Sequence, residues 1–491
     1  MKKSLLVLLL VCTGLMVKNV TAQDANSFYF MRGVPQTYHV NPALQPEFDF
    51  FIGLPGLAPL KFNFKTPIGV SDVLMYDPTI DSTITFLHPN ASKDEFLNAL
   101  DDFSNFTTEL STSIASIGMK ISEYSFLSFD IRQKALVDLG YSRDFFRLPM
   151  LGFDDGSVYD LEMDMTLSLY SEWSMGLSRK IGDKLTVGWR GKLLFGQANV
   201  HTKNFNINVA TTEEQWDVGA DIQVRASSPY LLDYVTEASQ VPFSTAFADF
   251  DNIDIPTPTS TEIREMIFNP ANFGMAMDLG VNLRLFDWLQ LSASVVDFGS
   301  IKWDSMVSVD YNVEYVYNGV NGGNLEEGFQ DVFTDSLKTT FDRVSTVKDK
   351  YRSTIPTKIY IGGAFYLHPY VSFGLLSRTD IYNSRLKQQF TASANLYPIR
   401  MFSTSLSYTL IQGKYSSYGI GVSLKLLPFN LYILTDIGPS LTRYHVSDDI
   451  PVDLPLDFRN INFKIGMNLA IGGPARGKKA KKQEYDLPLV D

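Results

Sequence analysis

The sequence is poor in cysteine, in histidine and in long apolar segments, and each shortage excludes a class of protein. The 491 residues include one cysteine, Cys12, so a fold held together by disulfide bonds is excluded. After the N-terminal leader no stretch has 18 consecutive apolar residues, which excludes a protein that crosses a membrane by helices. The five histidines lie far apart, and neither a His-Glu-x-x-His nor a Gly-x-Ser-x-Gly motif is present. We therefore expect neither an enzyme nor a bound cofactor.

The N-terminal 22 residues have the pattern of a secretory signal peptide. A basic start precedes the apolar run Leu5–Val11, and small residues end at Ala22, after which we predict cleavage. The apolar run continues weakly to Val17, and Cys12 lies inside this continuation and follows Val11, which is not a small residue, so lipidation is not expected. The mature chain then has 469 residues, with 39 Lys and Arg against 54 Asp and Glu, a formal charge of −15. That sign argues against nucleic acid as a partner.

Residues Ile355–Gly472 alternate between apolar and polar side chains in six or seven successive segments. In Met401–Ile411, for example, one register is apolar and the other is hydroxylic: Phe402, Leu406, Tyr408 and Leu410 against Ser403, Ser405, Ser407 and Thr409. A period of two is typical of β-strands. The pattern leaves two classes open: a water-soluble all-β sandwich, or an outer-membrane barrel whose apolar face meets lipid.

Three features favour the barrel. The side chains of the polar register are small and uncharged, as expected for side chains that face a crowded lumen. Short turns at 367–369, 397–400 and 427–429 alternate with longer connections at 379–385, 412–416 and 438–457. Aromatic residues make up 13% of the chain, with 24 Tyr and 35 Phe, as membrane-interface girdles require. We predict an all-β fold, a transmembrane antiparallel β-barrel.

The barrel is expected to span residues 48–473, with a tail, basic and then acidic, at 474–491. Termini on the same periplasmic side require an even number of strands. Every segment taken at face value gives about 16 strands, whereas an extramembrane hairpin at Asn199–Arg225 gives about 14, within a range of about 12 to 16. We prefer 14.

Residues Gly472–Lys478 match most of the phosphate-loop pattern, but Lys479 replaces the required Ser or Thr and no parallel sheet follows.

Residues 23–47 precede the barrel and lack strand periodicity because prolines interrupt them. They are either a disordered leader or a plug folded into the barrel mouth. Their apolar content favours the plug. The candidate plug residues are Arg32, Gly33, Pro35, Asn41, Pro42, Ala43 and Pro46.

Helices are expected only in the connections. Ser92 with Glu95, and Thr259 with Glu262, form capping boxes. In the insertion 304–353 one helical face carries Phe329, Phe333, Leu337 and Phe341. This helix either packs on its own loop or forms a lid over the pore. A weak metal-like cluster, Asp249, Asp251 and Asp254, lacks the glycine and terminal glutamate of a calcium loop, so we expect a solvated acidic loop and no metal.

The stretch from Arg32 to Ala43 carries a family resemblance. Its Asn41-Pro42-Ala43 resembles the N-terminal Asn-Pro-Ala of the long-chain fatty-acid transporter (FadL-like) barrels and of type IX secretion-associated barrels. The whole stretch, from Arg32–Gln36 through Asn41-Pro42-Ala43, looks like the opening of a family of Gram-negative outer-membrane proteins of unassigned function. The resemblance implies an N-terminal hatch and lateral release of an apolar ligand, but no ligand-binding residue can be carried over.

The sequence therefore supports a ranked set of functions. The first is an outer-membrane channel or transporter for small or apolar solutes, closed by an N-terminal plug. The second is a scaffold that docks proteins of a secretion or envelope complex without transport, and an embedded enzyme ranks last. The expected partners are outer-membrane lipid, an apolar small molecule and envelope or secretion proteins.

Overall fold

The structure is a computed structural model that describes residues 26–152, 156–212, 215–228, 271–304, 307–317, 350–382, 385–411, 415–426, 428–447 and 450–472. Several sequence predictions lie outside the described residues: the signal peptide, the second capping box (Thr259, Glu262), the acidic cluster (Asp249, Asp251, Asp254), the lid helix (Phe329, Phe333, Leu337, Phe341) and the tail 474–491.

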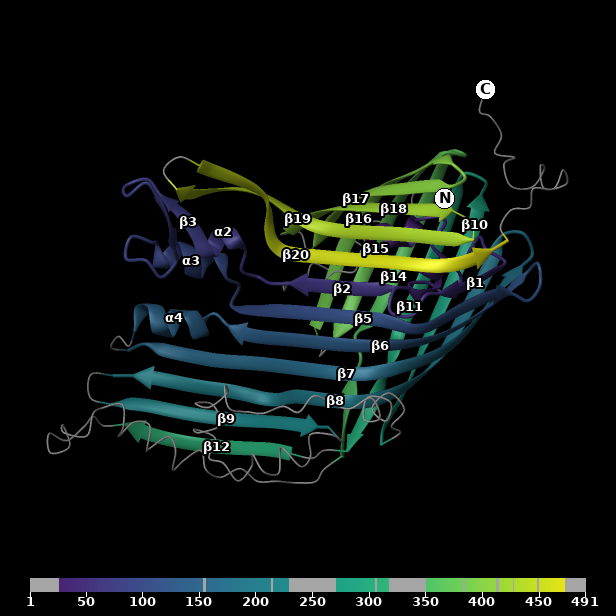
Figure 1. Cartoon of the computed structure of the whole chain (residues 1–491). Coiled ribbons are helices and arrows are strands. Elements are labelled where there is room, and N and C mark those ends of the chain that lie inside the picture. Colours follow the sequence, from purple (N-terminus) through teal and green to yellow (C-terminus); the bar gives the residue numbers. More distant parts are fainter. Residues whose placement is uncertain are drawn as a thin grey trace, which may run out of the picture.

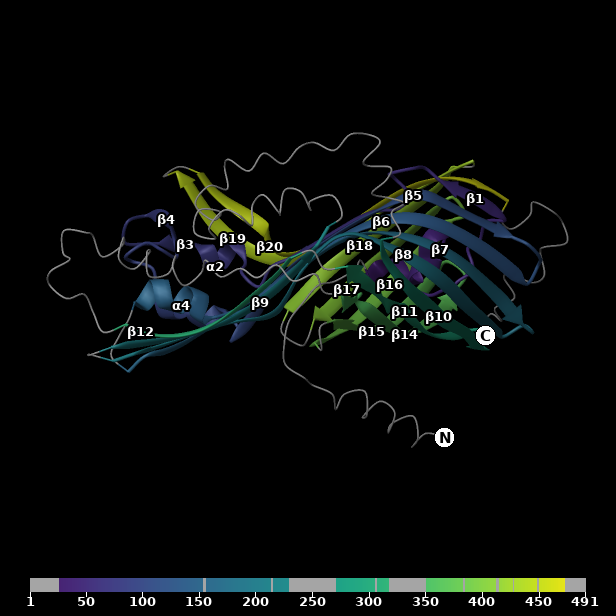
Figure 2. The ribbon, with the colours of Figure 1, turned by 90° about the horizontal axis from the view of Figure 1, so that it is seen from below.

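Fourteen antiparallel strand positions close into a barrel (Figures 1 and 2). The strands of the ring are β1 (Phe50–Gly53), β2 (Leu60–Lys65), β5 (Phe103–Lys120), β6 (Ser125–Ser142), β7 (Val158–Ile181), β8 (Leu185–Thr211), β10 (Asn272–Phe286), β11 (Leu289–Asp304), β14 (Thr357–His368), β15 (Val371–Tyr382), β16 (Arg385–Ile399), β17 (Phe402–Ile411), β18 (Tyr415–Leu426), β19 (Phe429–Ser447) and β20 (Ile450–Ile471). The short strands β1 and β2 share one position, and both pair with β20 and with β5, which closes the ring. The predicted number of 14 strands is confirmed.

The apolar register of each strand faces outward and the polar register faces the lumen. In β14, Ile361 and Leu367 are 56% and 73% exposed, whereas Lys358 and Tyr360 are buried. The strands β14, β15, β17 and β18 have 10 to 12 residues, close to the nine to eleven that a tilted strand needs to cross a bilayer. A water-soluble sandwich would bury the apolar side instead, so the barrel interpretation is confirmed. Among the described residues, no helix is long and apolar enough to cross a membrane.

The two ends of the barrel differ. Short turns close one end, where exposed aromatic side chains gather as at a membrane interface: Tyr124, Phe286, Trp288 and Tyr370. At the other end, here called the outer end, β5–β8, β19 and β20 continue well beyond the opposite wall (Figure 1). The first half of β8 pairs with β10, and its second half pairs with β9 (Trp216–Ser227), which pairs in turn with β12 (Val307–Tyr317). β13 (Lys350–Thr354) continues the line of β14 along β11. The predicted hairpin at Asn199–Arg225 thus lies outside the ring.

Two predicted loops are wrong. Residues 379–385 were expected to form a longer connection, but β15 extends to Tyr382 and β16 begins at Arg385. Residues 438–457 were expected to connect two strands as a long loop, but they form the outer parts of β19 and β20, which pair as far as Ser447 and Ile450. The register shifts between Ile437 and Pro439, between Pro439 and Thr442, and again between His445 and Ser447, and these shifts interrupt the alternation. A bulge hides a strand from a period-two pattern because it moves every later side chain to the other face.

A small module covers the outer end of the extended wall. It contains α2 (Val70–Val73), the hairpin β3 (Leu74–Asp77) and β4 (Ser82–Thr85), α3 (Lys93–Ala99) and α4 (Asp144–Leu151). Its core is apolar and consists of Phe96, Leu97, Leu100 and Met150. The predicted cap of α3 is confirmed, because Ser92 Oγ accepts a hydrogen bond from the Glu95 amide at 3.2 Å.

Candidate functional site

Residues 26–47, here called the N-terminal segment, lie inside the barrel (Figure 2). They include two short 3₁₀ helices, η1 (Asn26–Phe30) and η2 (Pro35–His39). All of residues 26–43 are buried except Phe30 and Arg32, which are half-buried. Apolar side chains of the segment pack with lumen-facing residues of the wall in one cluster: Phe28, Tyr29, Met31, Val34 and Val40 with Val296, Tyr360, Leu376, Tyr432 and Leu434.

The hydroxyl-rich face of the wall supplies donors to the main chain of the segment. Ser403 Oγ donates to the carbonyl of Arg32 at 2.8 Å, and Ser294 Oγ donates to that of Val40 at 2.6 Å. The carbonyl of Gly33 accepts from Ser423 Oγ at 3.1 Å and from Asn430 Nδ2 at 2.8 Å. A buried irregular segment needs such partners, because it has no ladder of its own to satisfy its carbonyl groups.

Asn41-Pro42-Ala43 forms a corner against strands β8, β10 and β11. Asn41 Nδ2 donates to the carbonyls of Val281 and Ala293, at 3.3 and 3.4 Å, and Asn41 Oδ1 accepts from the Ala43 amide at 2.9 Å. Two lumen-facing glycines make room for the corner. A Cβ atom on Gly280 or on Gly188 would lie closer than 3.0 Å to Asn41 or to Pro42.

The other candidate plug residues lie in the same segment. The Arg32 guanidinium lies between two wall tyrosines, 4.9 Å from the ring centre of Tyr366 and 4.7 Å from that of Tyr397. Gly33 has a φ of +80°, a left-handed conformation that favours glycine. Pro35 begins η2, and Pro46 is buried next to Glu47, whose carboxylate pairs with Lys425 of β18.

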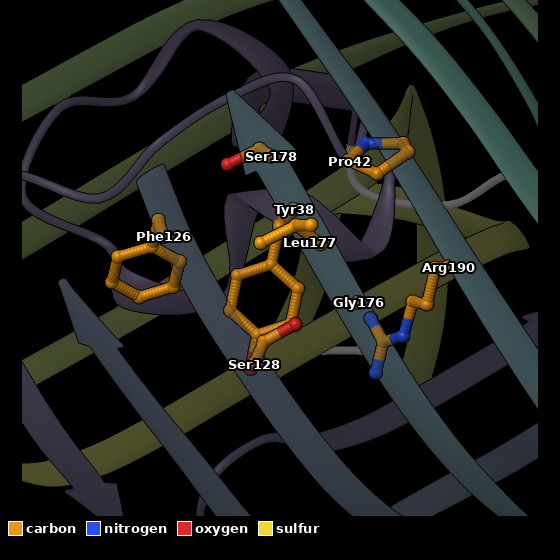
Figure 3. Close-up of a pocket in the computed structure, with 8 residues that line it drawn as sticks. All are labelled: Tyr38, Pro42, Phe126, Ser128, Gly176, Leu177, Ser178 and Arg190. Atoms are coloured by element: carbon orange, nitrogen blue, oxygen red, sulfur yellow. The ribbon is translucent and has the colours of Figure 1, made fainter. Parts of the chain in front are cut away.

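A buried ionic contact holds the middle of the segment. Asp130 of β6 accepts a hydrogen bond from Tyr38 Oη at 3.0 Å, lies 3.2 Å from His39 Nε2, and pairs with Arg190 of β8. In Figure 3 the Tyr38 ring lies between Phe126 and the Arg190 guanidinium, which is 5.0 Å from the ring centre. The cavity beside these side chains measures about 10 Å³, the space of about one water molecule.

Protonation of His39 is expected to weaken this contact. Burial lowers the pKa of His39 well below its usual value, and the charge of Arg132 adds to the effect, whereas Asp130 opposes it. A displaced segment would regain a His39 pKa of about 6.5. Docking is therefore fully stabilised above that pH and loses stability as the pH falls below it. We expect the thermal unfolding midpoint to drop between pH about 7.5 and about 5, and His39→Gln to remove most of that dependence. An equal drop in the variant would contradict this assignment.

A second ionic network lies on the lumen face of the wall beside the segment. Its members come from six strands and alternate in charge: Arg132, Lys134, Glu172, Lys192, Asp278, Asp297 and Lys358. Lys134 lies 2.7 Å from Glu172, and Lys192 lies 2.6 Å from Asp278. Asp297 has a φ of +60° within a bulge of β11 and contacts three lysines of the network. The sequence analysis did not predict these charged lumen residues. The available signal was that Asp130, Arg132 and Lys134 occur at every second position of one strand.

Together these features define the class of protein. A closed 14-stranded barrel with an apolar outer belt, aromatic side chains at one rim and a polar, charged lumen is a transmembrane β-barrel of the outer-membrane type. The chain belongs to the family of unknown function DUF5723, whose model matches residues 42–436. No curated protein matches it.

Solved structures similar to the chain include a FadL homologue of Pseudomonas aeruginosa, with a TM-score of 0.40 and 11% identity over 92% of this chain and 99% of that chain. The toluene transporter TbuX of Ralstonia pickettii has a TM-score of 0.39 and 9% identity over 90% of this chain and 98% of that chain. The toluene transporter TodX of Pseudomonas putida has a TM-score of 0.37 and 8% identity over 92% of this chain and 99% of that chain.

Proposed function

We propose that this protein is an outer-membrane channel for small or apolar solutes, exported by a signal peptide cleaved after Ala22 and closed by its N-terminal segment. One observation carries the proposal: the segment occupies a lumen that a barrel of this size would otherwise leave open. The segment acts as a plug, and its candidate residues, from Arg32 to Pro46, fix it to the wall.

The contacts of the segment suit a part that moves. Many of them are hydrogen bonds and ion pairs to lumen side chains, which water can replace when the segment leaves. The two 3₁₀ helices are short, and the segment adds no strand to the barrel. Its departure therefore leaves the ring of strands unbroken.

A disulfide bond between the segment and the wall tests the proposal. Met31 Sδ lies where a side chain on Gly421 would be, so Met31→Cys with Gly421→Cys places two thiols together in a mature chain without cysteine. We expect oxidation to abolish arabinose-driven liposome swelling and planar-bilayer conductance, and a reductant to restore both. The two single-cysteine variants are the controls. Equal flux in the oxidised and reduced double variant would refute a mobile plug.

The outer end supports a second candidate, a scaffold that docks an envelope or secretion protein. Large apolar side chains are exposed there, beyond the belt: Ile80, Leu87 and Val158 are 49%, 72% and 62% exposed. A scaffold would show no solute flux in either redox state and would copurify with a stoichiometric partner. Replacing these three side chains by serine would then release the partner without changing the barrel.

A further inference from the structure

Two basic side chains lie next to each other on the outward face of the barrel wall, at its outer end. Lys302 of β11 is directly opposite Arg352 of β13 in the antiparallel register, and both residues are exposed. The Cβ atoms of directly opposite residues are about 5 Å apart, so two like charges in these positions repel each other. A negative charge bound between them would remove that repulsion.

A bulge in β11 directs Lys302 away from the lumen. The register shift at Asp297 adds one residue to β11, and an added residue moves every later side chain to the other face. Beyond the bulge Ile301 and Trp303 are buried, whereas Lys302 and Asp304 are exposed. The basic pair is therefore separate from the charged network of the lumen.

The acidic side chain beside the pair already has a partner. Asp304 lies opposite Lys350 of β13, and its carboxylate is 3.5 Å from the ammonium of that lysine. In the part of the chain that the structure describes, Lys302 and Arg352 have neither an ion pair nor a side-chain hydrogen bond.

Two hydroxyl groups extend the pair toward the membrane. Ser300 and Thr354 lie opposite each other, two residues before Lys302 and two after Arg352, and thus on the same outward face. These four residues are here called the rim patch. Each of the four side chains can donate hydrogen bonds, and together they carry two positive charges, which is the chemistry that recognises a phosphate group.

The rim patch borders the apolar belt of the barrel. Met275 of β10 pairs with Ser300, and Phe298 comes two residues before Ser300 on the same face. Met275 and Phe298 are 61% and 56% exposed. A water-soluble acidic partner would leave these apolar side chains uncovered, whereas a lipid would cover them with its acyl chains while its headgroup reached the patch.

The depth of the rim patch matches a headgroup layer. The 13 residues of β11 from Leu289 to Ile301 separate Lys302 from the aromatic rim at Trp288. With a rise of about 3.3 Å per residue and a tilt of about 45°, they cover about 30 Å across the membrane. The apolar band of an outer-membrane barrel is about 25 Å tall, and its short turns lie on the periplasmic side. The rim patch therefore lies just beyond the acyl chains of the outer leaflet.

We propose that the rim patch binds a phosphate group of lipid A, the phosphorylated glycolipid of the outer leaflet. The phosphate lies between Lys302 and Arg352, whose guanidinium can donate two parallel hydrogen bonds to it. The acyl chains lie along Phe298 and Met275. The site goes beyond the channel function, and it holds whether or not the barrel conducts a solute.

Native mass spectrometry of the full barrel, released from detergent micelles, tests the site. The probes are lipid A with its phosphates, lipid A from which the phosphates have been removed, and inorganic phosphate. We expect phosphorylated lipid A to bind roughly tenfold to a hundredfold more tightly than the dephosphorylated form, as charge-assisted hydrogen bonds predict. Lys302→Gln and Arg352→Gln should each reduce that preference, and the double variant should abolish it.

Lys350→Gln is the matched control. It removes the same charge from the same face of β13, but from a lysine that is paired with Asp304. The preference for phosphorylated lipid A should therefore persist in this variant. An equal loss of preference in Lys350→Gln and in Arg352→Gln would show a general attraction between the barrel and anionic lipid, and would overturn the proposal.

Thermal unfolding separates a lipid site from a structural role. Without lipid, the double variant should unfold at the same temperature as the wild type or slightly above it, because it loses a repulsion. Phosphorylated lipid A should raise the unfolding midpoint of the wild type and not that of the double variant. A lower midpoint of the lipid-free double variant, equal affinities for the two forms of lipid A, or displacement of the lipid by an equal concentration of inorganic phosphate would each contradict the proposed site.

Discussion

Gly280→Val is expected to expel the Asn41-Pro42-Ala43 corner and to open the lumen. Gly280 of β10 faces inward, and any side chain there would overlap Asn41 and Pro42. The corner cannot shift sideways, because Asn41 is held by two wall carbonyls and a Cβ on Gly188 would meet the other side of Pro42. We expect planar-bilayer conductance to rise at least tenfold over that of the wild-type barrel, an order-of-magnitude expectation for unblocking a lumen of this size.

The matched control is a glycine on the opposite face. Gly363 of β14 faces lipid, and a Cβ atom there would meet its nearest neighbour, Leu291, at an ordinary 3.6 Å. Gly363→Val should therefore leave the conductance unchanged, although both variants add the same side chain to a barrel strand. Equal conductance of the Gly280→Val variant and the wild type would mean that the corner does not hold the segment in the lumen.

The fold class could be predicted because alternate residues of a barrel strand face lipid and the lumen, and lipid favours apolar side chains whereas the lumen favours polar ones. In β16 and β17 this alternation is unbroken, and the exposed and buried sides follow it residue by residue. The count of 14 depended on placing the Asn199–Arg225 hairpin outside the ring, and the pairing of β8 with both β10 and β9 shows why that was correct. Where bulges shift the register, as in β19 near Pro439, the same method fails.

The site was less accessible from the sequence, because its partners are far apart along the chain. Asn41 is a candidate from its motif alone, but the atoms that hold it are known only once Val281 and Ala293 are seen to lie beside it. The inward glycines gave one usable signal, since Gly188 and Gly280 occupy the register that otherwise carries polar side chains.

Lys192→Met is expected to destabilise the barrel by about 3 to 5 kcal/mol, the range for removing one partner of a buried ion pair. Lys192 is fully buried and contacts Asp278, Asp297 and Glu172. Its loss removes the ion pair of Asp278, whereas Glu172 and Asp297 keep other cations of the network. Urea unfolding from lipid vesicles measures the effect, with Lys184→Met in the exposed β7–β8 turn as a control that should change stability by less than about 0.5 kcal/mol.

The double variant Lys192→Met with Asp278→Asn decides between loss of an ion pair and loss of packing. If the ion pair is the cause, neutralising Asp278 as well should recover a large part of the lost stability, because the carboxylate that lost its cation is then also gone. Methionine keeps most of the volume of lysine, so a packing defect would be small and would not respond to Asp278→Asn. Additive losses in the double variant would show that Lys192 and Asp278 are not energetically coupled, and the ion pair would then not be the source of the lost stability.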